Sequence, residues 1–112
     1  MRLANGSSPF EGRVEVLYQG IWGTVCDHFW DLDDAKVVCR QLGYGTAIAA
    51  PERAAFGEGK GHIWLDWLRC RGNENLISDC PHDGWGDTFG CDHGDDASAV
   101  CSVPGEKQSS TD

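Results

Sequence analysis

Six cysteines carry the most informative chemistry of this sequence. A zinc site needs close pairs such as C-x2-C, but the nearest cysteines here lie ten positions apart, which is poor spacing for four ligands around one metal. An even, widely spaced set favours disulfides, which persist in oxidising compartments. We therefore expect bridged cysteines and a protein that works outside the cell or in the secretory lumen. The six are Cys26, Cys39, Cys70, Cys80, Cys91 and Cys101.

Histidines and carboxylates offer general acids and bases, yet no motif around them indicates catalysis. No nucleophile-elbow or cysteine-protease signature surrounds any histidine. Aspartates are so numerous that some pair would lie close in any fold, so a close pair alone does not indicate glycosidase chemistry. We expect a protein that is not an enzyme. The histidines are His28, His62, His82 and His93.

The excess of acidic over basic residues limits the kinds of partner that the chain is expected to bind. Asp and Glu number 18 against 9 Lys and Arg, which gives a formal net charge of −9. Phosphate binding needs a basic footprint, so we expect no nucleic-acid site. Acidic side chains can hold a hard cation, or they can simply keep a secreted protein soluble. The composition leaves both interpretations open.

The two ends of the sequence indicate a piece of a larger extracellular protein. The first residues lack the apolar core of a signal peptide, and no run approaches the ~18 apolar residues of a membrane span. We expect one domain at residues 1–102 and a polar linker or disordered tail at residues 103–112. The triplet Asn5-Gly6-Ser7 is a sequon for glycosylation of Asn5, although many such triplets are never used.

Short β-strands are expected to position these groups. Residues 12–18 alternate apolar and polar side chains, and Gln19-Gly20 separates them from a second apolar stretch at residues 21–26. A two-residue loop with glycine between such stretches predicts an antiparallel hairpin. Apolar content predicts two further strands, at residues 63–68 and 97–102.

One convincing helix is expected at residues 33–42, where apolar side chains recur at helical spacing. Asp31 or Asp33 can cap its first turn, and Gly43 can end it in a left-handed conformation. Residues 73–80 predict at most a short helix. The fold class is therefore α+β: a curved antiparallel sheet around one helix, with long ordered loops and a small core that disulfides reinforce.

Several motifs occur in order along the chain: Gly12-Arg13-Val14-Glu15-Val16, Gly23-Thr24-Val25-Cys26-Asp27, Val37-Val38-Cys39-Arg40-Gln41-Leu42-Gly43, Ile63-Trp64-Leu65-Asp66 and Gly84-Trp85-Gly86. In this order they resemble the scavenger receptor cysteine-rich (SRCR) domain over residues 1–101. Tyr44 stands where eight-cysteine members have a cysteine, so the resemblance is to the six-cysteine group A. It implies the bridges Cys26–Cys91, Cys39–Cys101 and Cys70–Cys80. The two long bridges would each contribute about 4 kcal/mol in the chain-entropy model.

The resemblance also implies ligand capture outside the cell. One hypothesis is a domain of a scavenger or innate-immune receptor, part of a parent glycoprotein, that binds polyanionic microbial or modified host ligands with the help of calcium. The other is a non-catalytic protein-interaction module inside a secreted mosaic protease or oxidase. Neighbouring domains of the parent protein would decide between them.

Calcium is the cofactor that the resemblance implies, at a first site made by Asp27 and Asp95. Asp27 matches the first of two family aspartates, His28 replaces the second, and Asp95 replaces a glutamate. The implied bridge from Cys26 to Cys91 would bring Asp27 beside the loop that holds Asp95, and a cation would relieve the repulsion between their charges. Imidazole is a poor calcium ligand, so the site is expected to be weak or to prefer a transition metal.

Asp66 matches the family's neighbouring second cation site. Gly90 stands where some members have an asparagine ligand, and only Asp87 is close enough in sequence to compensate. The alternative for both sites is a solvated acidic rim that holds no metal.

Trp67, Arg69 and Arg71 are the candidate ligand contacts. If residues 63–68 form one strand, Trp64 and Trp67 point to opposite faces. Trp67 is then either an exposed binding anchor or a ring packed under a loop. Arg69 and Arg71 would project to one side of a continuing strand, near Lys60, where they contact an anionic ligand or simply pair with surface carboxylates.

Overall fold

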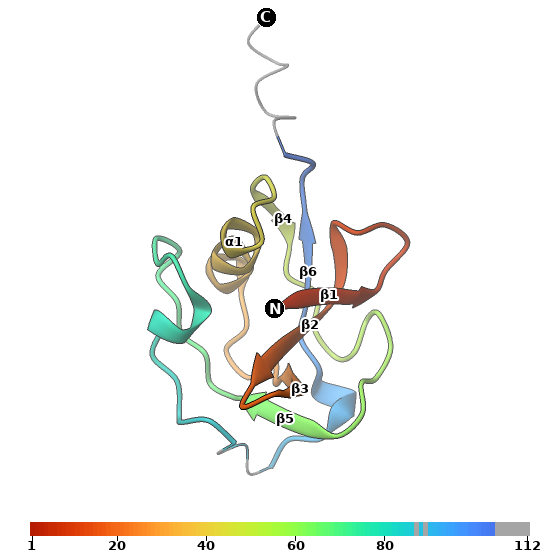
Figure 1. The fold of residues 1–112 in the computed structure, drawn as a ribbon, viewed down its shortest axis with the longest axis vertical. Coiled ribbons are helices and arrows are strands. Elements are labelled where there is room, and N and C mark those ends of the chain that lie inside the picture. The colour runs from red at the N-terminus through yellow and green to blue at the C-terminus, as the bar shows by residue number, and fades with distance from the viewer. Residues whose placement is uncertain (87, 89, 105–112) are drawn as a thin grey trace, which may run out of the picture.

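A curled sheet with one α-helix packed on it forms the body of the molecule (Figure 1). The computed structural model describes residues 1–86, 88 and 90–104, so Asp87 and the expected tail from residue 105 lie outside the described residues. This disulfide-stapled α+β architecture is the one that the sequence predicts. Its elements are β1 (Arg2–Asn5), β2 (Glu11–Tyr18), β3 (Ile21–Val25), α1 (Leu32–Gln41), β4 (Ala47–Ala49), β5 (His62–Leu65), the 3₁₀ turns η1 (Ile77–Asp79) and η2 (His93–Asp95), and β6 (Ser98–Cys101).

The strands follow the order β4-β6-β2-β3-β5, and β1 also pairs with β2. All of these pairs are antiparallel except β3 with β5, which run parallel. A parallel neighbour needs a long crossover connection, and here α1 and β4 lie between β3 and β5 along the chain. The sequence predicts an antiparallel sheet, and this prediction is wrong for the edge strand β5, which runs parallel to β3.

The hairpin between β2 and β3 forms where the sequence predicts it. Tyr18 pairs with Ile21, and the two loop residues, Gln19 and Gly20, have φ values of 52° and 78°. Positive φ at both loop positions matches the twist of the flanking strands, which is why glycine suits this turn.

Helix α1 begins at a capping box. The side chain of Asp31 accepts the N–H groups of Asp33 and Asp34, and the Asp34 carboxylate accepts the Asp31 N–H in return. Gly43 follows the helix with a φ of 79°. The predicted helix is therefore confirmed, shifted by one residue at each end.

Residues 66–72 depart from the expected strand. β5 stops at Leu65, and Trp67 has a φ of 56°, which lies far from the extended region of a regular strand. The alternation argument for Trp64 and Trp67 is therefore wrong, because the two are not on one strand. The expected helix at 73–80 is reduced to the single turn η1, and the short strands β1 and β4 were not expected at all.

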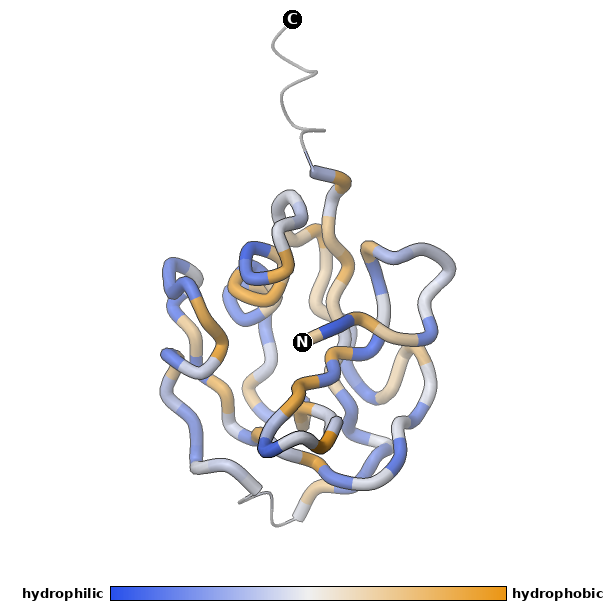
Figure 2. The backbone as a smooth tube through the Cα atoms, in the orientation of Figure 1, coloured by the Kyte–Doolittle hydropathy of each residue, from blue (hydrophilic) through white to orange (hydrophobic). Residues whose placement is uncertain are grey.

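The core lies between α1 and the sheet. Trp30, with its indole Nε1 donating to the Ser98 carbonyl at 2.8 Å, packs among aliphatic side chains; the fully buried ones include Val14, Val25, Val37, Val38, Leu65 and Leu68. Along the middle of β2 hydrophilic and hydrophobic residues alternate, as the changing colours of Figure 2 show. Within the described residues, no helix has both the length and the apolar character needed to cross a membrane.

Three disulfides join the elements: Cys26–Cys91, Cys39–Cys101 and Cys70–Cys80. These are the pairs that the family resemblance implies. The first ties the end of β3 to the segment before η2, and the second ties α1 to β6. The third closes a ten-residue loop beside η1.

Candidate functional site

The loop after β3 meets η2 at the first disulfide. Cys26 forms an isolated β-bridge with Asp96, and the Asp27 N–H donates to the Asp95 carbonyl at 2.8 Å. Both loops are anchored by the Cys26–Cys91 bridge. Asp27 and Asp95 thus lie side by side through their backbones, although they are far apart in sequence.

The side chains of these loops are not arranged like their backbones. The carboxylate of Asp95 clusters with the imidazole of His28 and not with the carboxylate of Asp27. The Asp27 carboxylate accepts the Arg53 N–H at 2.8 Å. Two of the clustered atoms are the sulfurs of the disulfide, which are not thiolates and do not serve as metal ligands. One imidazole and one carboxylate remain. The clustered ligand atoms, all within 4.8 Å of one another, belong to Cys26, His28, Cys91 and Asp95.

Asp66, the candidate for the second site, lies on the other side of the same histidine. Its side chain is buried, its Oδ1 accepts the Trp67 N–H at 2.8 Å and lies 3.1 Å from Nδ1 of His28. Burial raises the pKa of the Asp66 carboxyl, although the Trp67 N–H and His28 favour its charged form. The two cation sites that the sequence suggests are therefore joined by His28. Gly90 is exposed, and Asp87 lies outside the described residues.

A divalent cation would find two side-chain ligands in this cluster, the His28 imidazole and the Asp95 carboxylate. Calcium takes six to eight oxygen ligands, so its shell would also need Asp66, Asp27 and several waters. An imidazole with carboxylates is also a donor set that transition metals accept. Any cation held here would have His28 as its one nitrogen donor.

An exposed aromatic pair borders this cluster. The rings of Phe29 and Trp67 lie 4.4 Å apart, and the Trp67 ring is 5.8 Å from that of His28. Phe29 is 61% exposed and Trp67 is 37% exposed. Both have positive φ, 63° and 56°, which is unusual for bulky residues and is found most often at functional sites. Sequence reasoning named Trp67 but missed Phe29, which no motif marks.

The two candidate arginines make different local contacts. Nη1 of Arg69 lies 3.7 Å from the Asp83 carboxylate, and both side chains are nearly half exposed, so this ion pair contributes little. The Arg71 backbone N–H donates to the Glu74 carboxylate at 3.0 Å. Lys60, expected near them, instead lines a cavity with Arg2 and Arg13.

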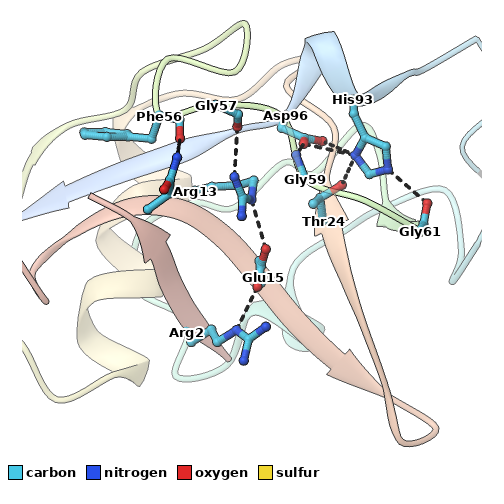
Figure 3. A network of polar contacts seen from close by, with 11 residues as sticks. Arg2, Arg13, Glu15, Thr24, Phe56, Gly57, Gly59, Gly61, His93 and Asp96 are labelled. Atoms are coloured by element: carbon cyan, nitrogen blue, oxygen red, sulfur yellow. Dashed lines mark hydrogen bonds and ion pairs between the residues drawn. The ribbon is translucent and has the colours of Figure 1, made fainter. Parts of the chain in front are cut away.

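That cavity lies between the strands β1 to β3 and the loop of residues 56–61, with a volume of about 270 Å³. Figure 3 shows the polar network beside it. Asn5, the exposed sequon residue at the end of β1, donates from Nδ2 to the Phe56 carbonyl at 2.6 Å. Its glycosylation stays a prediction.

His93 and Asp96 join the same network, but their geometry is not that of a catalytic triad. Nδ1 of His93 lies 3.0 Å from Oδ2 of Asp96 and 3.4 Å from the Thr24 hydroxyl, while Nε2 lies 2.9 Å from the Gly61 carbonyl. A triad places the nucleophile and the carboxylate on opposite ring nitrogens. Here both are on Nδ1, and Thr24 is buried.

Comparisons with known proteins agree with this architecture. The model of the "Scavenger receptor cysteine-rich domain" family matches residues 4–102. The chain belongs to the SRCR family. Its three disulfides fit the six-cysteine group A type.

Individual relatives include an SRCR domain superfamily protein of Patiria pectinifera, 57% identical over 90% of this chain and 9% of the relative. The galectin-3-binding protein of Rattus norvegicus is 56% identical over 91% of this chain and 18% of the relative. The SRCR domain therefore spans less than a fifth of these curated relatives.

Two solved SRCR structures superpose well. The third SRCR domain of murine neurotrypsin has a TM-score of 0.82 at 47% identity, with 91% of this chain and 94% of that one covered. The SRCR domain of mouse MARCO, in its dimeric form, has a TM-score of 0.76 at 44% identity and the same coverage. SRCR domains are extracellular, and they are generally non-catalytic modules for ligand or protein interaction in receptors and secreted proteins.

Proposed function

We propose that this SRCR domain is a calcium-assisted ligand-binding module of the scavenger and innate-immune type, and that it captures polyanionic microbial or host ligands. The observation that carries the proposal is that His28 contacts Asp66 and shares a cluster with Asp95, with Asp27 on the adjoining backbone. A cation bound among these acidic side chains would relieve the repulsion between their charges. The cation would then offer open coordination positions to an anionic ligand, which explains how a chain of net charge −9 could retain one.

Calcium titration into chelator-treated protein, followed by calorimetry, tests the cation site. Asp95→Asn and Asp66→Asn should each weaken binding at least tenfold. Asp79→Asn is the matched control, because Asp79 is an exposed aspartate in η1 and the change removes the same charge. No heat in the parent protein, or equal binding by all three variants, would show that no such site exists. Stronger binding of zinc than of calcium would reassign the cation.

Binding to a sulfated polysaccharide such as heparin, with calcium and with EGTA, tests the second half of the proposal. Binding should require calcium and should fall in Asp95→Asn. Binding that persists in EGTA would show that polyanion capture does not depend on the cation.

The second candidate function is protein interaction within a mosaic protein, and the exposed pair of Phe29 and Trp67 favours it. Paired exposed aromatics are typical anchors of protein interfaces. A relative named for binding galectin-3 and the SRCR domain of neurotrypsin are consistent with such a role. If Trp67→Ala abolishes binding to a partner of the parent protein while Asp95→Asn does not, this second function holds.

A further inference from the structure

The cavity beside β1 to β3 is separate from the acidic cluster. Arg2 comes from β1, Arg13 and Glu15 from β2, and Trp22 from β3. The opposite wall is the loop at Glu58, Gly59 and Lys60. None of the residues that line it is a candidate cation ligand.

A buried carboxylate holds two arginines in place within this cavity. Oε1 of Glu15 lies 2.7 Å from Nε of Arg2, and Oε2 lies 2.9 Å from Nε of Arg13. The Glu15 and Arg13 side chains are only 10% and 12% exposed. Glu15 contacts only the Nε atoms of the two arginines. The outer guanidinium nitrogens of Arg2 make no hydrogen bond among the described residues. Lys60 likewise has no ion pair within them.

The loop wall is fixed from behind (Figure 3). Nη1 of Arg13 donates to the Gly57 carbonyl at 3.0 Å, and the Gly59 N–H donates to Oδ2 of Asp96 at 2.7 Å. A Cβ at Gly59 would lie 2.6 Å from the Thr24 methyl and 3.1 Å from Nε of Arg13, so only glycine lets the loop approach this closely. The cavity is therefore pre-formed, which lowers the entropic cost of binding.

The charge of the lining contrasts with that of the whole chain. Three cationic side chains, from Arg2, Arg13 and Lys60, face two carboxylates, from Glu15 and Glu58. The surroundings are thus locally positive on a chain of net charge −9. The unused fork of Arg2 matches a planar carboxylate, and the lining carboxylates can accept hydrogen bonds from hydroxyl groups.

The remaining lining is apolar. Trp22 carries the Arg2 guanidinium 3.9 Å above its ring centroid, so the ring supports the guanidinium from one side. A volume of about 270 Å³ lies just below the range of drug-sized sites, which suits one sugar unit. We propose that this cavity binds a single carboxylated sugar, such as a uronic or sialic acid at the end of a glycan, without any metal ion.

Two-dimensional NMR titration with glucuronic acid and with N-acetylneuraminic acid tests this proposal. We expect a Kd on the order of 1 mM for so small a ligand, with shifts at the Trp22 indole and the Arg2 Nε, in the presence of EDTA. Glucose is the neutral comparison and should bind at least tenfold more weakly. Glucose 6-sulfate should also bind more weakly than glucuronic acid, because a sulfate ester is a much weaker base than a carboxylate and accepts hydrogen bonds less strongly.

Variants then locate the site. Arg2→Gln should weaken glucuronic acid binding at least fivefold, and Lys60→Gln at least threefold. Lys36→Gln is the matched control, because it removes the same charge from α1. The proposal is overturned if neither acid binds, if glucose or its sulfate binds equally well, or if Lys36→Gln weakens binding as much as Lys60→Gln. These titrations contain EDTA and no calcium. Their outcomes therefore leave the proposal of calcium binding at the acidic cluster untouched.

Discussion

The carboxylate of Asp34 accepts the backbone N–H of Cys70 at 2.7 Å. Through this one hydrogen bond the first turn of α1 is joined to the loop of the short disulfide, 36 residues further along the chain. The other oxygen of Asp34 completes the capping box with the Asp31 N–H at 2.8 Å. The side chain is fully buried.

The pH dependence of stability should report on Asp34. Burial raises its pKa to about 7, although the N–H groups of Cys70 and Asp31 favour the charged form. The folded state therefore keeps this proton to a higher pH than the unfolded state does, so the free energy of unfolding should fall as pH rises from about 4 to about 7. Asp34→Asn has no proton to lose. We expect it to cost about 1 kcal/mol at pH 4 and progressively less toward pH 7, as measured by urea unfolding. A penalty that grows with pH would contradict this.

His93 should add a second pH dependence, at higher pH. Burial lowers the pKa of its imidazole, but the Gly61 carbonyl and the Asp96 carboxylate raise it more, and the net direction is upward. A raised pKa means that the stabilisation is complete below about pH 6.5 and is lost as pH rises through the folded-state pKa. The protection factors of the amides at residues 57–61, which correct for the intrinsic rise of hydrogen exchange with pH, should therefore fall on the alkaline side. In His93→Gln that pH dependence should disappear; an unchanged profile would mean that His93 does not hold the loop.

The long disulfides should stabilise the domain more than the short one. Cys39 and Cys101 are 62 residues apart, whereas Cys70 and Cys80 are 10 apart. In the chain-entropy model the corresponding losses are about 4 and about 3 kcal/mol. Double Cys→Ala variants of each pair, compared by urea unfolding under oxidising conditions, give the two values. A larger loss from the short bridge would indicate that the loop at Cys70 contributes native contacts beyond its covalent link.

Phe29 should be replaceable without loss of stability. Its ring is exposed and its backbone has positive φ, a conformation that asparagine tolerates better than phenylalanine. We expect Phe29→Asn to change the free energy of unfolding by less than about 0.5 kcal/mol. Leu17→Asn, at an exposed position within β2, should be destabilising because asparagine is a poor strand residue. A large loss in Phe29→Asn would show that the aromatic pair is structural.

Local signals made part of this fold predictable. Gln19-Gly20 marks the hairpin and Asp31 with Gly43 marks the helix ends, because turn and cap conformations depend on neighbouring residues alone. β1 and β4 contain only four and three residues, which is too short for an alternating pattern to predict a strand, and the partner of β4 is the distant β6. Residues 66–68 look like a continued strand by composition, but the chain leaves the strand at Asp66, where the side chain accepts the N–H of Trp67.

The candidate sites depend more on tertiary structure. The sequence could pair Asp27 with Asp95 only through the bridge that the family resemblance implies. It could not show that His28 joins Asp66 to that pair, because three loops must first be placed. The cavity of Arg2, Arg13 and Lys60 is assembled from three strands and a glycine-rich loop, and no motif connects these segments.

The arrangement of the two long disulfides also decides how the domain would carry mechanical tension. A pull on both ends passes from Cys26 to Cys101 by two covalent routes: across the first bridge and along ten residues (91 to 101), or along thirteen residues (26 to 39) and across the second bridge. Fully stretched, these routes measure about 35 and 45 Å. Residues 40–90 lie on neither route and stay slack. Asp95 lies on the shorter route, which becomes taut first, and Asp66 lies on neither route, so tension would load the backbone beside one carboxylate of the acidic cluster and leave the other unloaded.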